Sequence, residues 1–402
     1  MTDGILLVAT IGWPSAARYA SGFVAASCTV DSLSPKHAPV RASRYVRRHY
    51  DYNALFPIAS LRAAIARSKP ELIVACDDRA VAQILQLHRR ATLQDSQIAG
   101  LIECSFGNVA SYDLVLSRQA SLEAMRKEGV RVPDSVAIES EAAVDAALAR
   151  IGLPAVLKAD GSWGGEGVAV VRTRAEALSA YRRLAFPAPR WRSMARALRR
   201  KDAHFLREAI APKQRAMSLQ KFIAGGPAAS AFAAKDGTVV ASIAYDVLAA
   251  QGTIGPPNVI RRVDCPQIGD AARKVAKRFG LSGMHGLDFI RDAQGDVHLL
   301  EINPRATQGG TLPFGAGRDL PAALAATLSP LNAGLRPAIG NDLVAFFPRA
   351  WQPDGGEHWL PQAHHDIPWD DPGVLRTLID LPAGARDNQL RDIVYSRMAQ
   401  HA

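Results

Sequence analysis

The sequence predicts a multidomain protein in which an α/β region is followed by an α+β region. Its 402 residues exceed what one compact core organises, so two or three domains are expected. In the first part of the chain, short apolar runs alternate with helical patterns, which is typical of a parallel sheet covered on both faces. Further on, shorter strands are joined by a glycine-rich loop and by a tight turn, which indicates antiparallel hairpins.

The first region contains two buried-strand patterns, at residues 4–11 and 71–75, each followed by a helical pattern. Helical patterns cover residues 16–25, 57–68 and the segment that runs through His88. The first strand ends at Gly12 without a GxGxxG motif, so it gives only weak support for dinucleotide binding. This alternation predicts a parallel sheet over about residues 1–115.

Two carboxylates, Asp77 and Asp78, stand where the strand at 71–75 ends. The carboxyl end of a parallel strand is a favoured place for ligands. The same residues would also serve as the N-cap of the following helix. The sequence leaves both interpretations open.

Changes in pattern divide the chain. A helix expected over 118–128 stops at Gly129, a good C-terminal signal, and leads into a region of short strands. A second change occurs near residue 330, where Pro330 begins a stretch that interrupts a helical pattern. We therefore expect domains at 1–115 and 116–330 and a C-terminal extension at 331–402.

A lysine followed by a glycine-rich loop is the first candidate functional feature. Lys158 ends a strand at 155–158, and the loop contains Gly161, Gly164, Gly165 and Gly167 before a strand at 168–172. Glycines let the backbone approach phosphate oxygens, and the lysine adds a positive charge. The motif is not a Walker A loop, since no Gly-Lys-Ser/Thr follows. A plain hairpin whose turn needs glycine is the alternative.

A more specific feature is an acidic hairpin. The strands 287–291 and 297–302 turn at Gln294-Gly295-Asp296, which places Asp288 and Glu301 on neighbouring strands. Glu301 and Asn303 are two apart and share one face of the sheet. Two carboxylates and a carboxamide suit Mg²⁺ that bridges nucleotide phosphates. An amphipathic hairpin with its acids in solvent is the alternative, but it leaves the apolar surroundings of Glu301 unexplained.

Arginines near these motifs are candidates for binding anions. Arg305 follows Asn303 by two residues and has the reach to contact a transferring phosphate or a substrate carboxylate. Arg261 and Arg262 are candidates for binding a substrate anion, with Arg261 preferred, and ordinary surface arginines are the alternative.

Together, the segments VLKADGSWGGEGV and GLDFIRDAQGDVHLLEINPR resemble the ATP-grasp superfamily. The resemblance covers about residues 115–325 and is greatest to carboxylate–amine ligase-like and carbamoyl-phosphate-synthase-like members. It implies a Rossmann-like N-terminal (pre-ATP-grasp) domain, a two-lobed ATP-grasp domain with a lid at about 130–220, and a small C-terminal extension. It also implies ATP and Mg²⁺ as cofactors, with Mn²⁺ as a substitute.

The resemblance implies a role for each of several residues. Nucleotide contacts fall to Arg118, Lys158, Gly164, Gly165, Gly167 and the hinge residues Gln220, Lys221, Phe222 and Ile223. Metal ligands are Asp288, Glu301 and Asn303, catalytic residues are Lys158 and Arg305, and substrate contacts are Arg261 and Arg305. Arg118 stands where the family often has a lysine, and Gly226-Pro227-Ala228 replaces the acid that often holds the ribose.

The expected function is that of an ATP-dependent ligase, which activates a small-molecule carboxylate as an acyl phosphate for attack by an amine. A non-catalytic or regulatory ATP-binding protein on the same scaffold is the first alternative. A nucleic-acid-binding protein is the second, because the formal charge is +10 and basic residues crowd 190–201. That segment lacks zinc-finger spacing and any RNA-binding signature, so nucleic acid is not the expected partner.

Composition bears on location and assembly. The four cysteines are scattered without a CxxC pair, which disfavours a zinc site or a disulfide scaffold and favours the cytoplasm. No segment reaches the roughly 18 apolar residues of a membrane span. A homodimer is the default expectation for a soluble oligomer.

His285 and the segment His364–Asp371, which imitates a metal cluster, are interpreted as structural.

Overall fold

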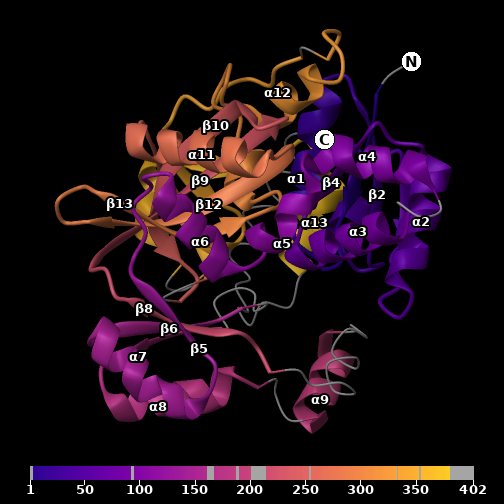
Figure 1. Ribbon diagram of the computed structural model, residues 1–402. Helices are drawn as coiled ribbons and strands as arrows, with labels where there is room; N and C mark the ends of the chain where they lie inside the picture. The colour runs from indigo at the N-terminus through magenta and orange to yellow at the C-terminus, as the bar shows by residue number, and fades with distance from the viewer. Residues whose placement is uncertain are drawn as a thin grey trace.

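The computed structural model describes residues 3–91, 95–160, 167–186, 190–200, 214–252, 255–332, 334–352 and 355–380. Within these residues the chain forms three sheets (Figure 1). A parallel sheet lies in the N-terminal domain, a large mixed sheet lies beside it, and a small antiparallel sheet forms a separate unit, which we call the lid, below them in the view of Figure 1. The expected mixture of α/β and α+β architecture is confirmed.

The N-terminal sheet is parallel throughout, with strand order β3-β2-β1-β4. Its strands are β1 (Gly4–Val8), β2 (Thr29–Ser34), β3 (Arg48–Asp51) and β4 (Leu72–Ala75). Ile5 and Leu7 pack toward α1 (Ser15–Ala25), whereas Leu6 and Val8 belong to the core on the opposite face. That opposite face is covered by α2 (Pro57–Ser68), α3 (Asp78–Ala91) and α4 (Ser96–Phe106). A continuous apolar strand is buried on both faces because successive side chains point to opposite sides.

The large sheet has seven strands in the order β13-β12-β9-β10-β11-β14-β15. They are β9 (Gly225–Lys235), β10 (Thr238–Ala250), β11 (Pro257–Val263), β12 (Gly283–Asp292), β13 (Val297–Asn303), β14 (Leu343–Phe346) and β15 (His364–Asp366). All neighbours are antiparallel except β14 and β15. Residues from the expected C-terminal extension thus complete one edge of this sheet.

The N-terminal domain and the large sheet share their hydrophobic cores. One core joins β1 and α1 to residues of β9, β10, β14 and α12 (Leu320–Ala326). The other joins α3 and α4 to β12, β13 and α11 (Pro266–Phe279). The two units therefore form one body, since burial of apolar surface holds them together on both faces.

The lid has a hydrophobic core of its own. Its strand order is β5-β8-β6-β7, all antiparallel, with β5 (Ser135–Ile138), β6 (Ala155–Ala159), β7 (Val168–Val171) and β8 (Met217–Lys221). The helices α7 (Val144–Ile151) and α8 (Arg174–Leu184) pack on this sheet, and α9 (Arg190–Arg200) lies apart from them (Figure 1). The hairpin that was expected around the glycine-rich loop is therefore β6–β7.

Shorter elements connect these units. The helices α5 (Tyr112–Val115) and α6 (Arg118–Lys127) lead from the N-terminal domain to the lid, and α13 (Pro372–Asp380) ends the described chain. The 3₁₀ helices are η1 (Pro39–Ala42), η2 (Val109–Ser111), η3 (Glu141–Ala143), η4 (Gln308–Thr311), η5 (Arg349–Trp351) and η6 (Glu357–Gln362). No helix of the described residues is long and apolar enough to cross a membrane.

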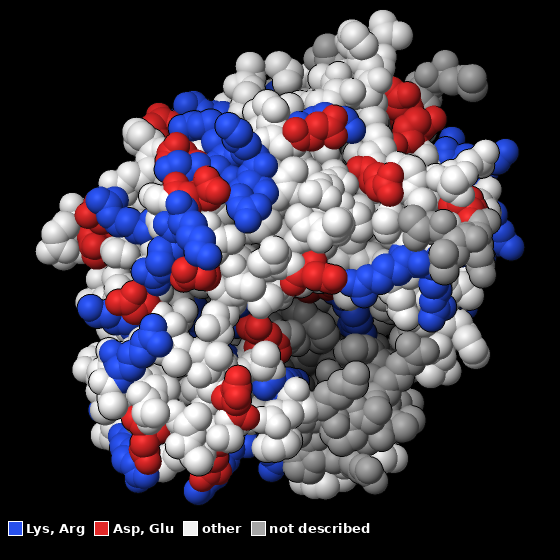
Figure 2. All heavy atoms as spheres, in the orientation of Figure 1, with Lys and Arg blue, Asp and Glu red and all other residues white. Residues whose placement is uncertain are grey.

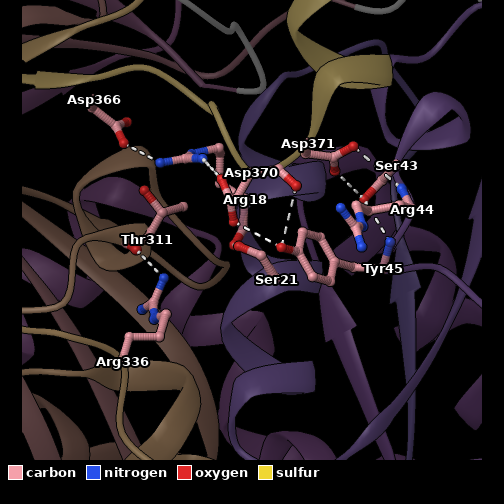
Figure 3. A network of polar contacts seen from close by, with 10 residues as sticks. All are labelled: Arg18, Ser21, Ser43, Arg44, Tyr45, Thr311, Arg336, Asp366, Asp370 and Asp371. Atoms are coloured by element: carbon pink, nitrogen blue, oxygen red, sulfur yellow. Dashed lines mark hydrogen bonds and ion pairs between the residues drawn. The ribbon is translucent and has the colours of Figure 1, made fainter. Parts of the chain in front are cut away.

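A polar network ties the C-terminal segment to the N-terminal domain (Figure 3). Arg18 of α1 forms an ion pair with Asp366 at the end of β15. Asp371 is buried and accepts hydrogen bonds from the Ser43 hydroxyl at 2.6 Å and from the Arg44 backbone N–H at 3.2 Å. These contacts fasten the edge strand β15 and its continuation to the N-terminal domain.

Candidate active site

The acidic hairpin forms as the sequence predicts, as β12 and β13. Asp288 lies directly opposite Glu301, and Gly286 lies opposite Asn303. Because residues directly opposite each other share a face of the sheet, Glu301 and Asn303 lie on the face that carries Asp288, and a register shift follows only after this pair. The Asn303 Nδ2 donates a hydrogen bond of 2.9 Å to Asp288 Oδ2. The three predicted metal ligands therefore lie together on one face of the large sheet.

The two carboxylates of this hairpin influence each other. Burial raises the pKa of Asp288 to about 6, and the neighbouring negative charge of Glu301 adds to this effect. The hydrogen bond from Asn303 and the charges of Arg305 and Lys158 act in the opposite direction. A buried acid beside a second carboxylate favours the binding of a cation between the two.

Arg305 connects the hairpin to the N-terminal domain. Its Nη2 donates to Asn303 Oδ1 at 3.2 Å, and its Nε lies 2.9 Å from Asp78 Oδ1. Asp78 begins α3 at the carboxyl end of β4, the place where ligands are expected on a parallel sheet. The guanidinium is thus held in place by two domains.

Asp77, the neighbour of Asp78, has a structural role. Its carboxylate accepts from the Thr10 backbone N–H at 2.6 Å, the Thr10 hydroxyl at 2.7 Å and the Ala80 backbone N–H at 2.8 Å. The bond to Ala80 is an N-cap interaction for α3. Of the two interpretations that the sequence left open, the N-cap applies to Asp77, whereas Asp78 lies at the candidate site and pairs with Arg305.

Lys158 lies on β6 of the lid and is 6% exposed. Burial and the positive charge of Arg118 lower its pKa to about 8, while the carboxylates of Glu301, Asp288 and Asp160 oppose the shift. Glu301 and Asp288 belong to the large sheet, so the charges of the acidic hairpin act on the lysine of the lid.

Arg118, at the start of α6, makes direct contacts with both units. Its Nη2 donates to Glu301 Oε1 at 2.6 Å, and its Nη1 lies 3.2 Å from Asp160 Oδ1 and 3.4 Å from the Ala159 carbonyl oxygen. Ser117 caps this helix by accepting from the Ala120 backbone N–H, which fixes where Arg118 emerges. Arg118 therefore links the lid to the acidic hairpin.

Two site residues were not singled out from the sequence. Asp160 forms an ion pair with Arg118. Tyr245 of β10 is buried, and the neighbouring charge of Asp288 contributes to its raised pKa. Asp160 follows Lys158 by two residues and therefore shares its strand face, a signal that was present in the sequence. The position of Tyr245 depends on strand register, which the sequence does not display.

The remaining nucleotide-contact candidates are partly described. Gly167 is buried next to the lid strands, where its carbonyl accepts from the Ala159 N–H at 2.8 Å. Gly164 and Gly165 lie outside the described residues. Gln220 is buried in β8, and Lys221 is exposed at its end. Phe222 and Ile223 are half-buried in the short connection from the lid to β9. The hinge candidates therefore lie where the lid joins the large sheet.

The preference for Arg261 as a substrate contact needs correction. Strand register pairs Arg261 with Asp246 and pairs Arg262 with Tyr245. Tyr245 shares the face of Asp288 through Ala229, so Arg261 projects from the opposite face of the sheet. Its guanidinium lies over the Trp359 ring, 5.7 Å from the ring centroid. Arg262 is on the site face, but it is paired with Asp342 at 2.6 Å.

The histidine candidates have structural surroundings. His285 is buried, its Nε2 lies 2.9 Å from the Ser282 carbonyl oxygen, and burial lowers its pKa to about 4. In the tail, Asp366 pairs with Arg18, and the His365 Nε2 lies 2.9 Å from the Leu360 carbonyl oxygen. No group of three or more His, Cys, Asp or Glu in the described ranges could hold a metal.

Two family models match adjoining parts of the chain. The carbamoyl-phosphate synthase L chain ATP-binding domain matches residues 117–189, which include Arg118 and Lys158. The ATP-grasp domain matches residues 200–309, which include the acidic hairpin and Arg305. In sequence, the chain has no significant match among curated proteins.

Solved structures share the fold at low sequence identity. N5-carboxyaminoimidazole synthase from Aspergillus clavatus, in complex with ADP and 5-aminoimidazole ribonucleotide, is 13% identical at a TM-score of 0.60, over 83% of this chain and 80% of that chain. Biotin carboxylase from Campylobacter jejuni is 16% identical at a TM-score of 0.56, over 83% and 72%. The biotin carboxylase domain dimer of Hydrogenobacter thermophilus 2-oxoglutarate carboxylase, with MgADP, ADP and bicarbonate, is 15% identical at a TM-score of 0.57, over 81% and 70%.

Proposed function

We propose that this chain, which belongs to the ATP-grasp superfamily, is an ATP-dependent ligase that activates a carboxylate as an acyl phosphate and joins it to an amine. One observation carries the proposal: charged residues of the lid, of α6 and of the large sheet converge on a single site, with Arg118 in contact with both Asp160 and Glu301. Similar solved structures hold ADP, which supports a nucleotide at this place.

The nucleotide would lie between the lid and the large sheet. Lys158 and Arg118 supply the positive charge that triphosphate oxygens need, and both are buried, so their charges are weakly screened. The segment Gln220–Ile223, at the joint between lid and sheet, would receive the adenine. Contacts that Arg118 now makes with carboxylates would then be exchanged for contacts with phosphates.

The acidic hairpin fits a divalent cation. Asp288, Glu301 and Asn303 offer oxygen atoms from one face, and the repulsion between Asp288 and Glu301 would be relieved by a cation. Mg²⁺ is the expected ion, and Mn²⁺ accepts the same ligands. When bound, the ion would offset the negative charge on the transferred phosphoryl group.

The chemistry needs positioning and charge more than proton transfer. A substrate carboxylate oxygen attacks the γ-phosphorus, the bond to the bridging oxygen breaks, and ADP leaves. The amine nitrogen then attacks the acyl carbon, phosphate departs, and the proton of the amine passes to solvent. Arg305, held by Asp78 and Asn303, would orient the carboxylate, and Lys158 would stabilise charge on the phosphoryl group. The lid would exclude water that would hydrolyse the acyl phosphate.

The test is an ADP-release screen of the purified protein against pooled carboxylic acids and amines, with mass spectrometry of the products. Glu301→Ala should abolish ADP release with every active pool, because it removes a metal ligand and the partner of Arg118. Glu123→Ala is the matched control, since Glu123 is an exposed residue of α6 that is paired only at the surface. Full turnover by Glu301→Ala would refute the metal assignment. ATP binding without turnover across the whole screen would favour a regulatory protein.

Nothing in the described residues specifically favours the nucleic-acid alternative. Figure 2 shows Lys and Arg gathered on the visible face with Asp and Glu among them. On α11, for example, Lys274 pairs with Asp270 at 2.8 Å, and Arg278 lies 3.5 Å from Glu128. Within the basic segment 190–201, Lys201 and several arginine side chains lie outside what the structure describes. Absence of RNA or DNA binding at low salt would remove this alternative.

A further inference from the structure

A pocket lies beside the proposed reaction centre, between the N-terminal domain and the end of β14. Its empty volume is about 480 Å³, which includes space open to solvent. The lining includes Trp13, Arg18, Gln308, Thr311, Phe347 and Arg349. We call it the α1 pocket, because Pro14 and Ser15 at the start of α1 form part of its wall.

The α1 pocket is connected to the proposed reaction centre through one short stretch of chain. Arg305 pairs with Asp78, and the next residue, Ala306, donates its backbone N–H to the Ala75 carbonyl oxygen at 2.9 Å. The chain then forms η4, whose residues Gln308 and Thr311 line the pocket. Both places lie at the carboxyl end of the N-terminal parallel sheet, where α/β proteins bind ligands.

The two arginines of the α1 pocket differ in their partners. Arg18 is neutralised by the ion pair with Asp366 and has Asp370 at 3.9 Å (Figure 3). Arg349 has no ion pair or hydrogen bond to its guanidinium among the described residues, and it stacks over the Trp13 ring at 5.1 Å from the centroid. Burial without an opposite charge lowers its pKa from the ordinary value. A half-buried cation without a counter-ion is costly unless a ligand supplies the negative charge.

Two further polar features of the α1 pocket lack partners. The Gln308 Oε1 is buried and makes no hydrogen bond within the described structure. The helix α1 starts at the pocket without a side-chain N-cap. Of its first backbone N–H groups, that of Ala17 donates to the Pro14 carbonyl oxygen at 3.1 Å, which leaves those of Ser15 and Ala16 for an anion. Apolar walls come from the Trp13 and Phe347 rings. Besides the ion pair of Arg18 with Asp366, the lining thus offers a cation, a hydrogen-bonding amide and two aromatic surfaces.

We propose that the α1 pocket binds the substrate of this enzyme through an anionic group other than the carboxylate that Arg305 would orient, namely a second carboxylate or a phosphate attached to a flat, apolar body. Arg349 and the start of α1 would hold the anionic group, Trp13 and Phe347 would contact the body, and Gln308 would hydrogen-bond to a polar group on it. The identification of the ligand as a substrate rests on the proposed function, whereas the binding of an anion in this pocket does not require catalysis.

Isothermal titration with two probes, phenylacetate and phenyl phosphate, tests the binding directly. The wild-type protein should bind at least one of them, and the better probe identifies the anionic group as a carboxylate or a phosphate. Arg349→Gln should weaken that binding at least about tenfold, since it removes the cation of the pocket that has no counter-ion among the described residues. Arg67→Gln, an exposed arginine of α2, is the matched control and should bind as the wild type does.

Two outcomes would overturn the proposal: neither probe binds the wild type, or Arg349→Gln binds the better probe as tightly as the wild type. Thermal unfolding verifies that each variant is folded, and Gln308→Ala provides the same comparison if Arg349→Gln does not fold. These titrations do not depend on ADP release. Absence of probe binding would therefore contradict the anion site but not the ligase activity, and absence of ligase activity would not contradict the anion site. Once an acid substrate is found, Arg349→Gln should raise the KM for that acid and leave the KM for ATP unchanged.

Discussion

The lid and the N-terminal domain both flank the large sheet, but they are attached to it by different forces. The N-terminal domain shares two hydrophobic cores with the sheet, one on each face of its own strands. The lid keeps its apolar residues in a separate core and meets the acidic hairpin through charged groups, chiefly the contacts of Arg118 with Asp160 and Glu301.

This difference indicates which joint can change during a reaction. Separating the N-terminal domain would expose apolar surface, which costs roughly 25 cal/mol for each Å². The polar contacts of the lid can be exchanged for phosphate contacts at little net cost, since one charged partner replaces another. We therefore expect nucleotide binding to act on the lid, and the N-terminal domain to remain fixed. Four predictions address this contrast.

The largest effect on activity is expected for Lys158→Met. Loss of the charge that faces the phosphates should reduce ADP release by about a thousandfold or more. The same change should stabilise the fold by about 1 to 3 kcal/mol at pH 7, because burial lowers the pKa of Lys158 to about 8 and the protonated lysine is therefore destabilising. Thermal unfolding and ADP release measure the two effects. Lys36→Met, at an exposed lysine, should change neither. A destabilised Lys158→Met would contradict the assigned cause of the pKa shift.

A smaller effect is expected for Arg118→Lys, which weakens the link between lid and sheet. A lysine cannot reach Asp160 and Glu301 with two separate nitrogen atoms, so the KM for ATP should rise by about ten- to a hundredfold. The lid should also become more susceptible to limited proteolysis without nucleotide. Arg67→Lys serves as the control. Unchanged kinetics and unchanged proteolysis would show that Arg118 does not join the two units.

The pH dependence of ATP binding should follow Lys158. Below pH 8 the lysine is protonated with or without nucleotide, so the affinity should be constant. Above pH 8 the free protein loses this proton, whereas phosphates retain it in the complex, so the Kd should rise by up to about tenfold per pH unit. Titration calorimetry between pH 6.5 and about 9.5 measures the slope. In Lys158→Met the slope should disappear; a slope that persists would assign the proton to another group.

The smallest effect on activity is expected at the joint of the N-terminal domain. Asp371→Ala leaves the buried Ser43 hydroxyl and the Arg44 N–H without their acceptor (Figure 3), and should lower stability by about 1 to 3 kcal/mol. The KM for ATP should stay within about twofold, because this joint is remote from the nucleotide. The neighbouring Asp370 is 58% exposed, so Asp370→Ala should have little effect on either quantity. An equal loss of stability in both variants would contradict the network.

The sequence predicts the acidic hairpin well for a physical reason. Asp288, Glu301 and Asn303 lie within one short hairpin, so local turn geometry and the two-residue period of strands are enough to bring them together. The same holds for the hairpin of Lys158. Where the residues of a site are close together in the sequence, local pattern is enough to predict that their side chains meet.

The failures concern contacts between distant segments. Arg261 was preferred over Arg262, but only the register of β10 against β11 shows that Arg261 faces away from Asp288. The α1 pocket combines residues near 13–18, 308–311 and 347–349, and no local pattern joins them. The pairing of Asp78 with Arg305 likewise requires the fold. Tertiary structure alone determines which of these side chains meet.

Titration of MgATP into the wild type, Lys158→Met, Glu301→Ala and the double variant tests most directly whether the lid and the sheet form one nucleotide site. Each single change should weaken binding by at least about tenfold, and the double change should weaken it by less than the product of the two, because both residues act on the same phosphates. Wild-type affinity in either single variant, or losses that multiply as if the residues belonged to independent sites, would contradict a site shared by the lid and the acidic hairpin.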